Sequence, residues 1–505
     1  MPASTSRSPI TIPALDEGLP SPGGTAPWSC VPKTPRIRKV VLLRGSALLR
    51  RYTISITLAV GMLSVLVVAL VANSGASATL LLEEPYGNLG FFTATGHSAV
   101  YLSGVCAETP VILRRCVLGE IGVVISRYDG VGRYDWIAIP LIPYLYAVDQ
   151  PEDVPLFADA KMVAFLRDRY RRTHLEDVAP DLPNGEIPGG NWYELVGSSY
   201  DRTTYGFEIE TTSAQDDALI LKFNSSPNRS HFHILTRNCA DFVKDVINFY
   251  QPKAVHRSYV ADVGITTPKQ MAKNLVKFSM RHPELGLSRV ILPQVPGSIA
   301  RSKAVHGVVE SFFKSKKYIV PSAFASPIFA GCLAAVFLGS GSGRFEPGRN
   351  AMVFVPDSEP DLPLGREDLQ AYRKALDNLP AMPDFETSGG NVPKVWKLIR
   401  SEARPGLDQN GRPVLLLNAG PDMVSVGASA DNVLTTGSPA YLVRALLKTR
   451  LQAELRRSNP LSVSGREFAR DWQLLQATMK EHGPQVTAQP VHRRLDSSAG
   501  NAMIR

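Results

Sequence analysis

The longest apolar stretch of the chain lies near its start. Residues 53–72 read TISITLAVGMLSVLVVALVA, without a charged side chain. A helix of that length spans a hydrocarbon core of about 30 Å. We therefore predict a transmembrane signal anchor over 53–73, preceded by a disordered basic segment over 1–52. The small residues at 73–78 offer signal-peptidase cleavage as the alternative.

A second apolar stretch covers residues 319–338 and contains Pro321, Pro327 and Gly331. Its hydropathy suits a second membrane span, and a buried hairpin or helix pair is the alternative. Lysines at 314–317 precede the stretch, against the expected charge bias for a second span. A large domain, however, is translocated largely regardless of such charges. Two spans would return the C-terminal part to the cytoplasm, whereas one would leave it outside.

Between these stretches the pattern predicts one α+β domain over residues 80–300. Strand-like runs bounded by turn residues alternate with three longer helical patterns. The expected strands are 96–102, 121–126, 134–139, 205–211 and 218–223. The expected helices are 156–172, one beginning at Cys239, and 267–281.

The C-terminal part predicts a small mixed α/β module over 345–485 and a disordered tail over 486–505. Short strands are expected at 352–355, 413–417 and 423–426. Ser438 and Pro439 form an N-cap and N1 pair for a helix to about residue 457. Ser464 and Glu467 predict a capping box for a last helix.

The net charge of +9 is concentrated before the first apolar stretch. Residues 1–52 hold eight Lys or Arg against two acidic residues, which is +6 of the total. A local basic surplus beside an apolar run indicates membrane topology, and no basic-aromatic pattern predicts nucleic-acid binding. We expect the lipid bilayer as a partner, with the folded domain on the extracytoplasmic side of the cell membrane.

The five cysteines are too few and too scattered for a disulfide scaffold, and no CxxC pair predicts zinc. Cys106 and Cys116 could bridge in an oxidising compartment. Cys239 is the candidate for a functional thiol, because it follows a strand-like run over 230–235 and a short polar turn. It precedes Phe242 and Val246 by three and seven residues, so it begins the packed face of a helix. Free N–H groups and the helix dipole favour a thiolate there.

A nucleophilic cysteine needs a base, and His97 is the natural partner because it begins a strand and follows Gly96. Each residue alone is more simply a packed structural side chain. The two together form a pattern: a histidine at a strand start and, about 140 residues later, a cysteine at a helix start.

This pattern resembles the circularly permuted branch of the NlpC/P60 papain-like superfamily, which includes the lecithin:retinol acyltransferase-like proteins. In that branch the histidine strand precedes the cysteine helix, as it does here. The matching positions are His97, Val100, Tyr101 and Leu102 in the strand, and Asn238, Cys239 and Phe242 in the helix. The resemblance covers about residues 90–250.

The resemblance implies a papain-like α+β fold, here membrane-anchored, and a thiolate that attacks an amide or ester carbonyl. Cys239 would be the nucleophile and His97 the general base. A third polar residue is expected on the following strand, where Glu120 is preferred and Asp135 is the alternative. Cell-wall peptides are the favoured substrate and lipid esters the second. The competing hypothesis is a non-catalytic binding or scaffold protein.

His231 and His233 present a metal alternative, because two histidines separated by one residue on a strand share a face. Zinc there would make Cys239 a ligand. No HExxH motif or Asp/His cluster supports it, so we expect no metal and no cofactor.

Overall fold

The computed structural model describes most of the chain after residue 75. The described ranges are 76–86, 95–129, 131–229, 232–297, 299–356, 358–379, 401–419, 422–427, 440–457 and 460–480. The predicted segments 1–52, 53–73 and 486–505 lie outside these residues.

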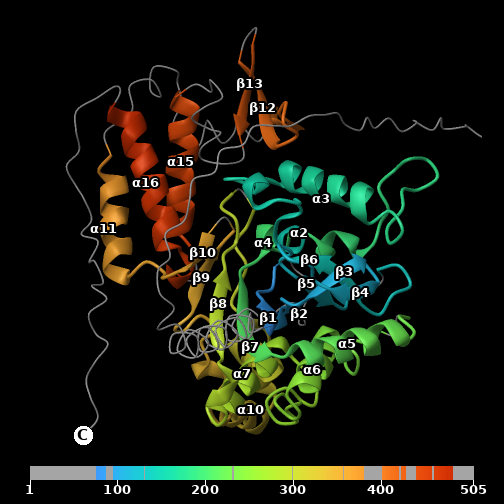
Figure 1. Cartoon of the computed structure of the whole chain (residues 1–505). Coiled ribbons are helices and arrows are strands. Elements are labelled where there is room, and N and C mark those ends of the chain that lie inside the picture. The colour runs from blue at the N-terminus through green and yellow to red at the C-terminus, as the bar shows by residue number, and fades with distance from the viewer. Residues whose placement is uncertain are drawn as a thin grey trace, which may run out of the picture. The chain divides into compact units, whose positions relative to one another are not determined.

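A mixed sheet organises the described chain, with strand order β10-β9-β8-β7-β1-β2-β5-β6 (Figure 1). Its neighbours pair antiparallel, except β8 and β9, which are parallel. The strands are β1 (Ala76–Glu83), β2 (His97–Leu102), β5 (Val123–Ser126), β6 (Ile137–Pro140), β7 (Thr204–Thr211), β8 (Ser288–Leu292), β9 (Met352–Val355) and β10 (Ser358–Asp361).

The strand β1 lies between β7 and β2 and pairs with β7 along its whole length. All of its residues except Ala76 are buried. Leu80 and Leu82 pack on one face of the sheet and Leu81 on the other. Burial on both faces removes the apolar-polar alternation of a half-exposed strand. β1 was therefore not predicted, and its first residues fall within the predicted cleavage site.

Helices cover both faces of the sheet (Figure 1). On one face lie α5 (Ser213–Ser225), α6 (Cys239–Tyr250) and α7 (Pro268–Ser279). On the opposite face lie α2 (Leu141–Tyr146), α3 (Ala160–His174) and α4 (Ser198–Asp201). Alternate residues of β2 join the two cores: Val100 and Leu102 pack with α6, whereas Ala99 packs with α2 and α3. This alternation decides which side chains of β2 can meet Cys239.

The C-terminal part contributes to the same sheet, because β9 pairs with β8 at Val290 and Met352. The described residues that follow include the helices α11 (Arg366–Asp377), α15 (Ala440–Leu455) and α16 (Gly465–Lys480). The Oγ of Ser464 accepts the N–H of Glu467 at 3.0 Å, as the predicted cap requires. A separate three-stranded sheet contains β11 (Arg404–Leu407), β12 (Pro413–Ala419) and β13 (Asp422–Gly427).

The predicted fold class is wrong. The chain is a mixed α/β protein whose large sheet runs through both the predicted α+β domain and the predicted C-terminal module. The prediction of a papain-like, membrane-anchored domain is not supported. Within the described ranges, every helix is too short or too polar to cross a lipid bilayer.

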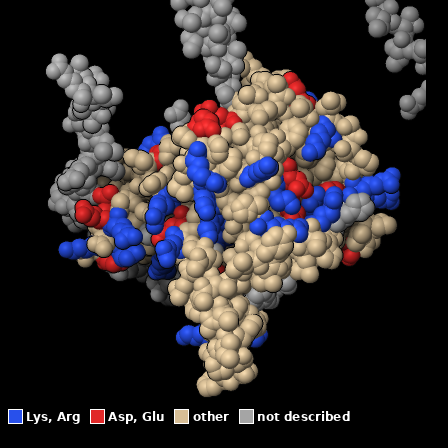
Figure 2. Space-filling model, turned by 90° about the horizontal axis from the view of Figure 1, so that it is seen from below, with Lys and Arg blue, Asp and Glu red and all other residues tan. Residues whose placement is uncertain are grey.

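The apolar stretch 319–338 is not one helix but two, α9 (Lys316–Ala325) and α10 (Pro327–Ser340), which follow α8 (Val308–Lys314). The break lies at Ser326, whose extended φ of −153° precedes Pro327. The alternative of a helix pair is right in its two helices but wrong in their burial, since neither has a buried residue. Residues 318–343 carry no charge, and Figure 2, which views the side where α10 lies in Figure 1, shows a projection that is tan at its tip with basic side chains at its sides.

One predicted strand is a helix. Residues 218–223 belong to α5, which begins with a capping box between Thr212 and Gln215. The apolar run Ala218–Phe223 carried the strand prediction. The cap at the start of the segment instead favours a helix, and the strand prediction did not include it.

Candidate functional site

The start of α6 is fixed by a capping box. The side chain of Asn238 accepts the N–H of Asp241 at 3.0 Å, and the Asp241 carboxylate accepts the N–H of Asn238 at 3.3 Å. Arg257 and Thr266 hold the same carboxylate, at 2.7 and 2.6 Å. Cys239 is therefore the first residue of a firmly anchored helix, as the sequence predicts.

Cys239 is half-buried as a residue, and its thiol lies inward, against Ser98 of β2. Burial raises the pKa of the thiol, and the nearby carboxylate of Glu83 acts in the same direction. The N–H and hydroxyl of Ser98 oppose this rise, together with the N–H of Ala240. Within the described chain the Ser98 hydroxyl has no hydrogen bond of good geometry. Cys239 is thus a neutral thiol in this arrangement.

His97 begins β2, directly after Gly96. Gly96 has a φ of +70°, and a Cβ there would lie 2.1 Å from the carbonyl oxygen of Glu83, so only glycine fits. The His97 ring stacks on Tyr128 with 4.2 Å between ring centroids. Burial lowers its pKa well below the usual value, and the positive charge of Arg202 adds to this. The imidazole is therefore neutral near pH 7.

The structure places Cys239 and His97 near one strand end but does not join them. Ser98 contacts Cys239 and shares the α6 face of β2, so His97 points to the opposite face. The Nε2 atom of His97 is buried without a hydrogen-bond partner among the described residues. The Cys-His dyad stays a prediction, and it requires the start of β2 to rearrange so that the imidazole leaves Tyr128 and reaches the α6 face.

A buried carboxylate lies opposite His97, and the sequence analysis did not find it. Glu83 pairs with His97 across β1 and β2. It accepts a short hydrogen bond from the hydroxyl of Tyr144, and Arg202 lies 3.0 Å from its other oxygen. Burial raises the pKa of Glu83, against the effects of Arg202 and Tyr144. Two adjacent acidic residues ending an apolar run, Glu83 and Glu84, were the available signal.

Glu120, the predicted third member, lies elsewhere. Its carboxylate binds the guanidinium of Arg114 at 2.6 Å and accepts the N–H of Val117 at 2.7 Å. These contacts lower its pKa to about 2. None of the contacts in the described chain connects Glu120 with Cys239 or His97. Its geometry is that of a residue that closes a surface loop.

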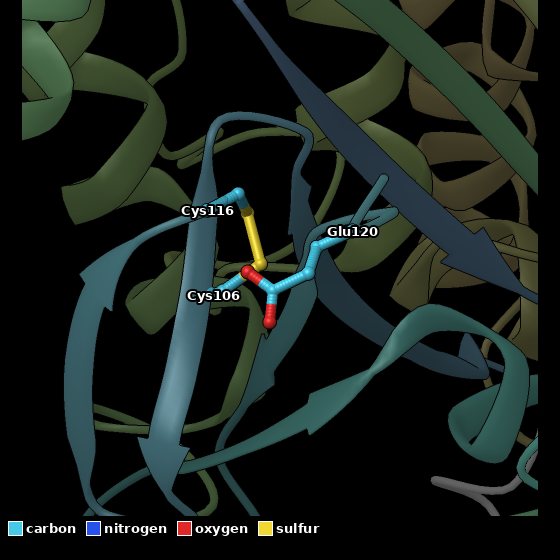
Figure 3. Close-up of side chains that lie close together, drawn as sticks. All are labelled: Cys106, Cys116 and Glu120. Atoms are coloured by element: carbon cyan, nitrogen blue, oxygen red, sulfur yellow. A yellow bond between two sulfur atoms is a disulfide. The ribbon is translucent and has the colours of Figure 1, made fainter. Parts of the chain in front are cut away.

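Glu120 lies beside a disulfide bond (Figure 3). Cys106 and Cys116 belong to the end of the hairpin formed by β3 (Val105–Thr109) and β4 (Ile112–Arg115), with an S–S distance of 2.08 Å. The two sulfur atoms and a Glu120 oxygen lie within 4.8 Å of one another. Because both sulfurs are used in the S–S bond, they are not thiolate ligands, and this cluster is not a metal site.

The histidine pair lies only partly within the described residues. His231 lies outside them. His233 is exposed in a turn, where its Nδ1 lies 3.0 Å from the hydroxyl of Thr236. The strand predicted for 230–235 is absent from the described residues 232–235, which form a turn closed by a bridge between His233 and Arg237.

Asp135, the alternative third residue, lies close to the helix start. One of its oxygens binds Arg127 at 2.6 Å and Arg237 at 2.8 Å. Arg127 in turn donates to the carbonyl oxygen of Asn238 at 3.4 Å. Asp135 therefore connects to the residue before Cys239 through arginine, without a described contact to His97.

No protein-family model, curated protein or solved structure matches this chain.

Proposed function

We propose that the protein is a thiol-dependent hydrolase or acyltransferase that acts on an amide or ester carbonyl through Cys239. The observation that carries the proposal is the position of the thiol. Cys239 is the first residue of an anchored helix, and its side chain contacts Ser98, the residue after His97. The N–H groups of Cys239 and Ala240 belong to the first turn, which a helix does not bond internally. They would donate to the oxyanion formed during attack.

The pKa shifts define how protons would move. A raised thiol pKa and a lowered imidazole pKa keep both groups neutral, so the resting state is not a thiolate-imidazolium pair. As the S–C bond forms, His97 would take the thiol proton. As the C–N or C–O bond breaks, the imidazolium would return that proton to the leaving group. Water or an acceptor hydroxyl then attacks the thioester and releases the thiol.

The cellular location and the substrate class are proposed as well. The disulfide between Cys106 and Cys116 supports folding in an oxidising compartment, such as the outside of a bacterial-type cell membrane. Peptide amides of the cell wall are the preferred substrates there, and lipid esters the second choice. The resemblance of the two short motifs to permuted NlpC/P60 proteins supports this order.

Active-site variants test the mechanism. Cys239→Ala and His97→Ala should each lower the turnover of p-nitrophenyl acyl esters and peptide amides at least about 100-fold. Mass spectrometry of a slow ester reaction should place one acyl group on Cys239. Cys332→Ala is the matched control, because Cys332 is the other free cysteine in the described chain and is exposed in α10. Turnover that survives Cys239→Ala would overturn the proposal.

A specific observation favours the second candidate, a non-catalytic binding protein. His97 is stacked on Tyr128 and makes no hydrogen bond to Cys239 in the described chain. If that arrangement is permanent, the thiol has no base. The same mass-spectrometric experiment separates the two functions. For a binding protein, the expected result is that the folded chain acquires no acyl group on Cys239 from any ester or amide probe.

A further inference from the structure

A pocket of about 480 Å³ opens between α5 and α6, on the stripe of α6 that begins at Cys239. Phe242, Val246 and Phe249 line it from α6, and Leu219 and Phe223 from α5. The volume lies in the range of small-molecule sites. Asp135, the alternative third residue, lines this pocket, whereas Cys239, His97 and Glu120 do not. The pocket is therefore distinct from the position of the thiol.

The floor and walls of the pocket are largely aromatic. Trp136 and Phe242 are buried, at 5% and 4% exposure. Phe223 packs edge-on against both, with ring centroids 5.1 Å from Trp136 and 6.0 Å from Phe242. These rings form a preformed apolar surface that would hold an aromatic ring or an alkyl chain.

The polar end of the pocket has incomplete hydrogen bonding. Arg127 and Arg237 both bind the same oxygen of Asp135. The other oxygen of Asp135 and the Nε of Arg127 are buried without a partner among the described residues. Buried charged atoms without partners are costly. A ligand that accepts from a guanidinium would give Arg127 a further partner, although it would not supply the donor that the Asp135 oxygen lacks.

The charges that line the pocket favour an anion. The cationic side chains are Arg127, Arg237 and Lys222, and the acidic ones are Asp135 and Asp245. One positive charge is therefore in excess. Arg127 lies 4.9 Å above the Phe242 ring, and the Lys222 ammonium 5.0 Å from the Phe249 ring. Cations thus border the same rings that form the apolar wall.

A purely structural role explains only part of this arrangement. Arg127 does position the start of α6 through the Asn238 carbonyl. Arg237 needs another explanation, because its side chain is 46% exposed and its charge is not required to neutralise Asp135, which Arg127 already binds at 2.6 Å.

We infer that this pocket binds an organic carboxylate with an aromatic or alkyl body. The carboxylate accepts hydrogen bonds from the guanidinium groups of Arg237 and Arg127, which suit this planar anion. The body of the ligand lies against Phe223, Phe242 and Phe249. The inference concerns binding and does not depend on catalysis by Cys239.

Calorimetric titration of the full chain tests it. The probes are N-acetyl-phenylalanine, which represents a peptide C-terminus, and octanoate, which represents a fatty acid. Their neutral counterparts are N-acetyl-phenylalanine amide and octanol. At least one anion should bind at least about tenfold more tightly than its neutral counterpart, as expected for charge-assisted hydrogen bonds. The anion that binds more tightly assigns the source of the ligand.

A matched pair of variants locates the site. Arg237→Gln should weaken binding at least about tenfold. Arg172→Gln should leave it unchanged, because Arg172 is equally exposed at 46% and also pairs with aspartates, but lies in α3. Cys239→Ala should bind like the unchanged protein, which keeps this test separate from the proposed catalysis. Equal binding of the anions and neutral counterparts, no binding at all, or no effect of Arg237→Gln would overturn the inference.

Discussion

His97 is a buried base held neutral by its surroundings. Its ring has little solvent contact, stacks on Tyr128 and lies in the field of Arg202. The folded state therefore resists protonation of this imidazole, whereas the unfolded chain takes up a proton at the usual pKa near 6.5. The consequence is a stability that depends on pH through one identified residue.

Replacing His97 should flatten the acid side of the stability profile. As pH falls below about 6.5, the unfolded state gains a proton that the folded state does not, so unfolding becomes easier. The thermal midpoint of the unchanged protein should drop more steeply between pH 6.5 and 4.5 than that of His97→Gln. Thermal scans at matched ionic strength measure both slopes. Identical slopes would show that His97 does not resist protonation.

Residue patterns predicted the position of Cys239 better than they predicted the residues around it. The N-cap at Asn238 and the helical repeat after it are local, so the helix start was readable from the sequence. Which face of β2 carries His97 relative to α6 depends on packing between distant segments. Glu83 was missed for the same reason, since only the pairing of β1 with β2 brings it opposite His97.

At the scale of elements, the hairpin of β3 and β4 depends on a covalent link. The disulfide between Cys106 and Cys116 closes a loop with a sequence separation of 10. A loop of this length contributes about 2–3 kcal/mol through the entropy of the unfolded chain. The double variant Cys106→Ala/Cys116→Ala should lose about that much, measured by urea unfolding with Cys332→Ala as control. An unchanged unfolding midpoint would mean that the bond adds no stability.

Helix α6 buries apolar residues, whereas α9 and α10 expose theirs. Phe242 of α6 is 4% exposed, whereas Ile328 of α10 and Phe324 of α9 are 82% and 86% exposed. By hydropathy alone, the 319–338 stretch has a stronger signal for burial in a membrane than α6 has. The break at Ser326 and the exposure of both helices are properties of the fold, which average hydropathy does not contain.

Substitution of these phenylalanines should show the difference. Phe242→Ala should cost roughly 3–5 kcal/mol, because it removes a buried ring from an aromatic cluster. Phe324→Ala should change stability by no more than about 0.5 kcal/mol. Urea unfolding of both variants measures the contrast. A large loss for Phe324→Ala would mean that another part of the chain covers α9.

At the scale of the whole molecule, the sequence predicted several elements but not their order in the sheet. The boundaries of β2, β7, β9, α6 and α7 follow local alternation, helical repeats and caps. The joining of β9 to β8 links residues 62 positions apart by a parallel pair, which no local signal contains. The fold class was therefore wrong even though many of its parts were right.

The central position of β1 has a consequence for how the chain acquires its structure. β1 is the first described strand, yet its full-length neighbour β7 begins at Thr204, more than a hundred residues later. During synthesis, β1 can pair early with β2, while its other edge stays without its native neighbour until β7 emerges. An unpaired edge of an apolar strand is a template for association with other chains. Folding that depends on such distant pairing is slow. The nascent protein would therefore be most prone to aggregation before residue 211 has been made.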